Sequence, residues 1–181
     1  MEGVLSLARP DFRPAFRSHP VPQLLDDLGE FAADVKGGYF SGRFKLAPGD
    51  AADWVGDAQK ASDFAVFGHD ADGSCYAYWL YDDRTPDDAP IVYLNVAHSG
   101  STVLAASLEE FLTLLAHDIV DLGMYFDEAA RPRKHSGGNL AFRTWLAECF
   151  GLEAVPHPER VVKRAAAAHP KLSERYGRRG V

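Results

Sequence analysis

The fold is decided by the stretch Phe64–Ala116, which reads FAVFGHDADGSCYAYWLYDDRTPDDAPIVYLNVAHSGSTVLAASLEEFLTLLA. Short apolar runs alternate there with turn signals, namely Asp72-Gly73, the acidic segment 82–90 and Ser99-Gly100. Asp-Gly between two apolar runs is a strong hairpin signal, because both central residues of the favoured turn adopt positive φ. The pattern predicts strands over residues 64–68, 74–81, 91–95 and 102–105.

The predicted strand 74–81 carries apolar side chains on both of its faces. One face holds Tyr76, Tyr78 and Leu80, and the other holds Cys75, Ala77, Trp79 and Tyr81. Side chains alternate along a strand, so both faces of this one must be covered. We therefore expect it to lie in the middle of a sheet.

The clearest helix signal follows the last of these strands. Ser107 and Glu110 have the spacing of a capping box, in which each side chain satisfies a free backbone N–H group. An apolar stripe at helical spacing then runs on to Gly123, a residue that often ends helices. Its members are Leu108, Phe111, Leu112, Leu115, Ile119 and Leu122.

Weaker signals flank this stretch. Residues 21–36 have helical periodicity and end at Gly37-Gly38, and residues 39–47 alternate loosely, as a strand with a possible bulge at Gly42 does. Residues 48–62 are read as a loop or a short helix. Asn139 is expected to cap a helix that Gly151 ends, and Pro158 is expected to open a helix that Pro170 stops.

The order of these elements predicts an α+β fold. We expect a mixed, largely antiparallel sheet of about five to six strands, packed against several helices. Residues 1–20 contain three prolines and are read as an extended arm, not a helix. Residues 21–170 form one domain, and the basic tail 171–181 is expected to fray.

Composition excludes several classes of protein. Apolar residues make up 46% and charged residues 25% of the chain, which is ordinary for a globular protein. No apolar run approaches the roughly 20 residues that cross a bilayer, and the first residues lack the pattern of a signal peptide. We expect a cytoplasmic protein without membrane contact, in which Cys75 and Cys149 are reduced core residues.

The net charge of −7 is unevenly distributed. Residues 46–130 carry 16 acids and two bases, whereas residues 131–181 carry 11 bases and four acids. Direct nucleic-acid binding through the acidic region is disfavoured, because phosphates are held by Lys and Arg. The acids are compatible with steering toward a basic protein partner, or with solubility alone.

The sequence contains few signals of a metal-binding or catalytic site. One hypothesis is a metal-dependent enzyme whose ligands are His69, Asp70, Asp72 and His98. Gly73 falls at the wrong position for a calcium loop. The same residues suit a turn. No nucleophile elbow, cysteine signature or phosphate-binding loop is present. The sequence therefore favours a non-catalytic domain with no metal and no cofactor.

Partner-binding residues are predicted around the two ends of strand 74–81. Aromatic side chains next to charges are the usual composition of interface hot spots, although Trp79 and Tyr81 also suit a core. The candidate contact residues are Asp70, Asp72, Trp79, Tyr81, Asp82, Asp83, Asp87 and Asp88.

The chain resembles the SUKH superfamily, the Smi/Knr-type domain, over roughly residues 24–122. The segment FAVFGHDADGSCYAYWL is similar to its central hairpin, and PIVYLNVAHSGSTVLAASLEEFLTLLA to the strand, turn, strand and helix that follow. The segments FRTWLAECFGLEAV and VVKRAAAAHPKL resemble the tails of bacterial members.

This resemblance implies an α+β fold and a function in protein binding. Bacterial members are regarded as immunity proteins that neutralise polymorphic toxins, many of them nucleases or deaminases, and no catalytic residues carry over. We expect an immunity protein that occludes the active site of a toxin domain. The alternative is a regulatory or scaffold module without a toxin partner. The sequence does not define the oligomeric state.

Overall fold

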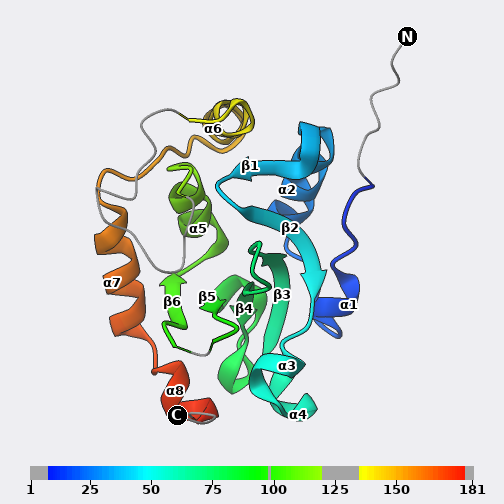
Figure 1. Ribbon diagram of the computed structural model, residues 1–181, viewed down its shortest axis with the longest axis vertical. Helices are drawn as coiled ribbons and strands as arrows, with labels where there is room; N and C mark the ends of the chain where they lie inside the picture. Colours follow the sequence, from blue (N-terminus) through cyan, green and yellow to red (C-terminus); the bar gives the residue numbers. More distant parts are fainter. Residues whose placement is uncertain (1–7, 98, 120–134, 178–181) are drawn as a thin grey trace.

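The structure is a computed structural model of the 181-residue chain, and it describes residues 8–97, 99–119 and 135–177. Figure 1 shows a curled sheet with helices on both of its faces and along its edges. The predicted α+β class is therefore confirmed, and so is a sheet of about six strands. Every pairing in this sheet is antiparallel.

The six strands of the described residues lie side by side in the order in which they occur in the sequence. Short connections join β1 to β2, β3 to β4 and β5 to β6, because antiparallel neighbours need only a tight turn between them. Strand β4 lies between β3 and β5, as its two apolar faces predict. The strands are β1 (Tyr39–Ser41), β2 (Phe44–Gly49), β3 (Phe64–His69), β4 (Cys75–Trp79), β5 (Ile91–Leu94) and β6 (Thr102–Ala105).

The helices surround this sheet and fill the longer connections. Short 3₁₀ turns are found at η1 (Lys36–Gly38), η2 (Tyr81–Asp83) and η3 (Pro86–Asp88). The α-helices are α1 (Arg13–Phe16), α2 (Gln23–Asp34), α3 (Ala52–Val55), α4 (Ala58–Ala61), α5 (Leu108–Leu115), α6 (Gly137–Phe150), α7 (Pro158–Ala168) and α8 (Leu172–Tyr176).

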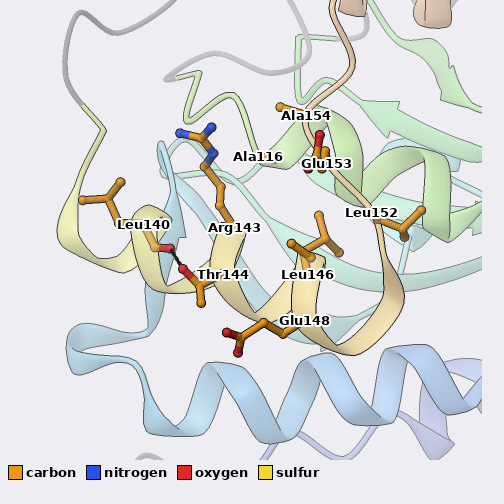
Figure 2. Close-up of a pocket in the computed structure, with 10 residues that line it drawn as sticks. Ala116, Leu140, Arg143, Thr144, Leu146, Glu148, Leu152, Glu153 and Ala154 are labelled. Carbon is orange, nitrogen blue, oxygen red and sulfur yellow. Dashed lines mark hydrogen bonds between the residues drawn. The ribbon is translucent and has the colours of Figure 1, made fainter.

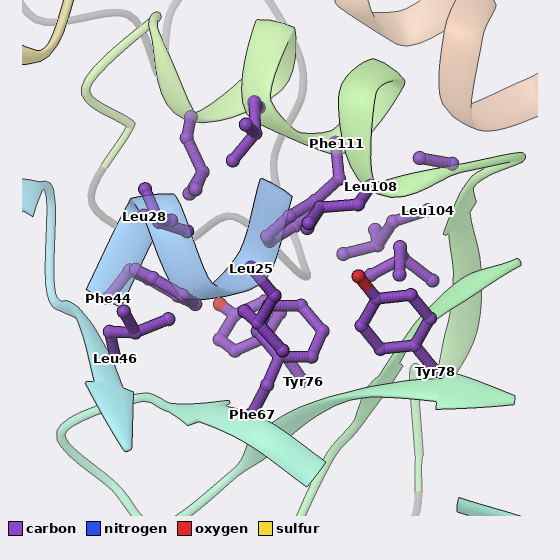
Figure 3. Packing of buried hydrophobic residues seen from close by; sticks show 14 of the residues in the cluster. Leu25, Leu28, Phe44, Leu46, Phe67, Tyr76, Tyr78, Leu104, Leu108 and Phe111 are labelled. Atoms are coloured by element: carbon purple, nitrogen blue, oxygen red, sulfur yellow. The ribbon is translucent and has the colours of Figure 1, made fainter. Parts of the chain in front are cut away.

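The larger core lies between one face of the sheet and helices α2 and α5 (Figure 3). Its centre is aromatic, and the Phe111 ring lies 5.7 Å from the rings of both Phe67 and Tyr76. Helix α2 contributes Leu25 and Leu28 from its buried face. Burying each such side chain stabilises the fold by about 1.5–3 kcal/mol, so this core holds the helical layer on the sheet.

A second core lies on the opposite face of the sheet. It contains Val66, Trp79 and Val92, all fully buried, and it is covered by residues of α3, α7 and α8. Strand β4 supplies side chains to both cores, which is why no residue of this strand is exposed.

Both edges of the sheet are covered by helices. Helix α7 runs alongside β6 (Figure 1), and its Val161 and Ala165 belong to the two separate cores. At the other edge, the start of α6 lies against β1, where a Cβ atom at Gly138 would lie 2.4 Å from the Tyr39 carbonyl oxygen. Covered edges do not accept an added strand, so a partner is expected to bind elsewhere.

Buried polar contacts join β1 to the ends of α5 and α6. Asn139 donates from Nδ2 to the carbonyl oxygens of Phe40 (3.0 Å) and Leu115 (3.2 Å). Asp118 accepts from the backbone N–H groups of Gly42 and Ser136. These bonds satisfy backbone groups that would otherwise be costly to bury.

Several sequence-based expectations about local structure were wrong. Residues 39–47 are not one strand, because Gly42 (φ +49°) lies in the turn between β1 and β2. The Asp72-Gly73 hairpin exists, but only Gly73 has positive φ (+92°), so its turn is of another type. The Gly73 N–H donates to the Asp70 carbonyl, which closes the turn over four residues.

Helix ends also differ from the expectation. Helix α5 ends at Leu115, well before Gly123, which lies outside the described residues together with the rest of 120–134. Ser107 caps α5 as predicted, but Glu110 accepts from the backbone N–H of Ala106, so the capping box is only partly formed. The cap of α6 is Ser136, and Asn139 is buried in its first turn.

The described parts of the N-terminal arm and of the C-terminal tail contain short helices that the sequence did not predict. The arm contains the short helix α1, which forms because Phe12 and Phe16 are buried against the domain. The tail contains α8, whose Leu172 is buried. Cys75 is buried as expected, whereas Cys149 is exposed near the end of α6 and is not a core residue.

We expect Tyr78→Phe to stabilise the protein. Within the described part of the chain, the Tyr78 hydroxyl oxygen is buried without a hydrogen-bond partner. An unsatisfied buried hydroxyl costs about 1–3 kcal/mol, so its removal should raise the free energy of unfolding by up to about 1 kcal/mol in urea titrations. The matched control is Tyr76→Phe, whose hydroxyl contacts Asp70 (3.5 Å). A Tyr78→Phe protein less stable than wild type would contradict this prediction.

Candidate functional site

The acidic loop, residues 81–90, connects β4 to β5 at the end of the sheet that also carries α3, α4 and α8 (Figure 1). Its two 3₁₀ turns carry four exposed aspartates, which are Asp82, Asp83, Asp87 and Asp88. The chain places these acids outward because Pro86 and Ala89, the apolar residues on either side of Asp87 and Asp88, are buried. The loop therefore exposes its carboxylates while its apolar residues are anchored in the protein.

Hydrogen bonds within the loop hold its shape. The backbone N–H of Asp88 donates to the Thr85 carbonyl (3.0 Å), and the Arg84 guanidinium donates to the Asp88 carbonyl (3.3 Å). The Trp79 N–H donates to the Pro90 carbonyl (2.9 Å), which ties the end of the loop to β4. A loop fixed in this way loses little conformational entropy on binding a partner.

The backbone of the loop is strained at two neighbouring residues. Asp82 and Asp83 have φ values of +54° and +58°, in the left-handed region that non-glycine residues seldom adopt. Aspartate tolerates this region better than most residues. Strained backbone is found preferentially at functional sites, and here it turns both carboxylates to the surface.

Trp79 and Tyr81 do not lie at the surface. Trp79 has no exposed area and Tyr81 only 4%, so the expectation that they contact a partner directly is corrected. Their rings lie 4.2 Å apart, under helix α8 and the segment before it. Trp79 is buried because β4 is a central strand, both of whose faces are covered by other parts of the same chain. Tyr81 lies in η2, where its ring packs on Trp79 and its hydroxyl bonds His169.

Polar contacts between the C-terminal segment and the body of the protein form what we call the terminal clasp. The Trp79 indole N–H donates to the Tyr176 hydroxyl (2.8 Å), which in turn donates to Asp63 (2.7 Å). Further along, the Tyr81 hydroxyl and His169 Nδ1 share a hydrogen bond (2.8 Å).

Sequence reasoning missed the terminal clasp, because the tail reads as a basic run. The one available signal was the spacing of Leu172 and Tyr176, four residues apart and therefore on one face of a helix. The helical signal is weak because the segment also contains four polar residues and is followed by Gly177.

Electrostatic pairing connects the clasp to the acidic loop. The Arg175 guanidinium donates to both carboxylate oxygens of Asp82, at 2.8 and 2.7 Å, which lowers the pKa of Asp82. Arg84 and Arg175 also lie over the Tyr81 ring, at 4.6 and 4.7 Å from its centroid. Two cations therefore neutralise part of the loop, and Asp83 and Asp87 remain exposed beyond them.

The predicted contact residues Asp70 and Asp72 lie at the opposite end of β4 from the acidic loop. Their carboxylates accept hydrogen bonds from the backbone N–H groups of Ala71 and Ser74 (2.8 Å each). This is the role that turns give to aspartate. The structure thus separates the eight candidate residues into a hairpin pair, a buried aromatic pair and a surface group of four.

Catalytic and metal-binding arrangements receive no support from the described residues. No three His, Cys, Asp or Glu side chains among them are placed to hold a metal ion. His98, one of the candidate ligands, lies outside the described residues. Burial raises the pKa of Cys75 to about 12, with a further contribution from Asp50, so this thiol is protonated at neutral pH and is a poor nucleophile.

A shallow groove of about 500 Å³ lies between α6 and residues 152–154 (Figure 2). Leu140, Leu146 and Leu152 line it together with small residues, and Arg143, Glu148 and Glu153 carry its charges. Leu140 is 52% exposed, so the groove is open to solvent. It lacks the converging buried polar groups of an active site.

Comparisons with known proteins found no match: no family model, no curated protein and no solved structure is similar to this chain. None of the helices among the described residues is both long and apolar enough to span a membrane.

We expect Tyr176→Phe to loosen the terminal clasp. The variant keeps the ring but removes the hydroxyl, which leaves the Trp79 N–H without its acceptor and Asp63 without this donor. The loss should lower the free energy of unfolding by about 1–2 kcal/mol in urea titrations. Tyr39→Phe, at an exposed tyrosine, serves as the control. Equal stability of both variants would show that the hydrogen bonds of the Tyr176 hydroxyl contribute nothing to stability.

Stability should depend on pH through His169. Burial, with a smaller effect of Arg84, lowers the pKa of His169 from its ordinary 6.5. The unfolded state therefore binds more protons between the two pKa values, and stability rises with pH up to about 6.5 and is constant above it. Lowering the pH from about 7.5 to 5.5 should destabilise the wild type more than His169→Gln. Identical pH profiles for the wild type and His169→Gln would refute this prediction.

Proposed function

We propose that this protein is a non-catalytic binding domain whose acidic loop meets a basic surface on another protein. The observation that carries the proposal is the exposure of Asp83, Asp87 and Asp88 on a loop that buried residues and internal hydrogen bonds hold in place. Pre-positioned carboxylates attract a basic partner over distance and reject acidic ones. The covered sheet edges favour binding through a loop over strand addition.

The partner we propose is a toxin domain, and the role is that of a cytoplasmic immunity protein. Two considerations support this form of the proposal: the resemblance of residues 24–122 to the SUKH superfamily, and the charge of the loop. A nuclease or deaminase toxin needs Lys and Arg in its substrate groove to hold phosphates. Carboxylates placed over such a groove occupy the positions of those phosphates and block access of the nucleic acid.

Reversing the loop charge should weaken partner binding. We expect Asp83→Lys, Asp87→Lys and Asp88→Lys together to lower the association rate about ten-fold, because exposed charges act mainly on encounter. Asp82 is left intact, since its partner Arg175 holds α8 in place. The matched control reverses three exposed acids elsewhere, Asp34, Glu148 and Glu153, with the same change of net charge.

The partner for this measurement is obtained by affinity purification from the native cytoplasm, followed by recombinant expression of each stoichiometric component. Kinetics by surface plasmon resonance and protection of cells that express the toxin are then measured for both triple variants. A toxin that binds the two variants at equal rates would rule out the acidic loop as the contact. Stoichiometric recovery of regulatory proteins alone would replace the immunity role by the scaffold alternative.

A further inference from the structure

Helix α8 packs Tyr176 among aromatic side chains, in an arrangement like that of a bound peptide. We call it the aromatic slot: the rings of Trp54, Phe64 and Trp79 surround the Tyr176 ring, at centroid distances of 6.0, 5.0 and 6.2 Å. At its inner end, the Trp79 N–H and the Asp63 carboxylate both bond the Tyr176 hydroxyl. Apolar walls with a few converging polar groups are the usual construction of a binding site.

The rim of the slot recognises the residue before this tyrosine. Asp82 receives two parallel hydrogen bonds from the Arg175 guanidinium, and the Tyr81 ring lies under the same group. A planar guanidinium satisfies both contacts, whereas a lysine ammonium cannot form the paired hydrogen bonds. The slot and its rim therefore select a segment in which an arginine is followed by a tyrosine.

The attachment of α8 is of a kind that opens locally. The helix has five residues, too few to be stable alone, and of these only Leu172 is fully buried. The backbone at His169 and Lys171, on either side of Pro170, is extended and joins α8 to α7 without helical continuity. Segments with few buried contacts open at a lower free energy than the whole fold.

We propose that α8 is an internal pseudo-ligand, and that the aromatic slot binds a partner segment in which arginine precedes tyrosine. This inference rests on the proposed function, because the acidic loop supplies Asp82 to the same surface. Asp63 and Asp82, which both contact α8, give the slot two negative groups that favour a basic segment. The partner displaces α8, inserts its tyrosine beside Trp79 and pairs its arginine with Asp82.

Displacement has a measurable consequence for affinity. A covalently attached ligand competes at an effective concentration in the millimolar range. The partner's apparent association constant is therefore its intrinsic value multiplied by the fraction of molecules in which the slot is open. Emptying the slot should increase affinity without any new contact.

The test uses the full chain and a synthetic peptide, HPKLSERYG, which copies residues 169–177. The peptide is titrated by calorimetry into the wild type and into the variant Arg175→Ala/Tyr176→Ala, with a peptide carrying the same two alanines as control. We expect the variant to bind the unaltered peptide at least about ten-fold more tightly than the wild type does, and neither protein to bind the control peptide. Equal affinities, or no binding to a variant with the circular dichroism of the wild type, would overturn the proposal.

A second measurement applies if the variant does not fold. Hydrogen exchange of the wild-type protein should show the amides of Glu174, Arg175 and Tyr176 exchanging at least about a hundred-fold faster than those of β4, through local opening. Exchange of both groups at one rate would mean that α8 leaves only on global unfolding, and would refute the pseudo-ligand.

The experiments can refute the acidic-loop proposal and the aromatic-slot proposal independently. The triple reversal of Asp83, Asp87 and Asp88 leaves the contacts of α8 intact, whereas Arg175→Ala/Tyr176→Ala leaves those three acids in place. If the reversal slows partner binding but the double alanine variant binds the partner no more tightly than wild type, the acidic loop remains the contact and the slot inference is wrong.

Discussion

The burial of β4 on both faces is the constraint on which the rest of the structure depends. A strand that reads CYAYW cannot leave either side in water, so the chain must supply two covering layers. Helices α2 and α5 form one layer through the larger core, and short helices from distant parts of the chain form the other. The position of α8 follows from this, since Trp79 needs a cover for its ring and an acceptor for its N–H group.

The acidic and basic regions of the chain are partly paired with each other in the fold. The basic C-terminal region returns to the acidic body, where Arg175 pairs with Asp82 and Arg164 with Glu110. Such surface pairs add little stability individually, but they determine which acids remain available. Asp82 is occupied within the chain, and Asp83, Asp87 and Asp88 stay exposed. The fold thus divides the acids of this region into those that are paired within the chain and those that are exposed on the surface.

The same segment links structure to binding. Arg175 and Tyr176 stabilise the second core, yet they are held mainly by groups that would suit an external ligand equally well. In this interpretation the acidic loop determines how fast a basic partner arrives, and the aromatic slot determines which partner is kept. The covered edges of the sheet leave loops and helix ends as the available contact surfaces.

The sequence by itself determined the elements whose signals are local. The alternating runs of 64–105 define four neighbouring strands, and Ser107, Gly151 and Pro158 mark helix ends, because turns and caps depend on the residues beside them. Only the tertiary structure decided that Trp79 is a buried partner of Tyr176, that Asn139 holds β1 to α5, and that Asp82 is paired with Arg175. Each of these contacts joins residues from different elements, most of them far apart in the chain, so no local pattern records it.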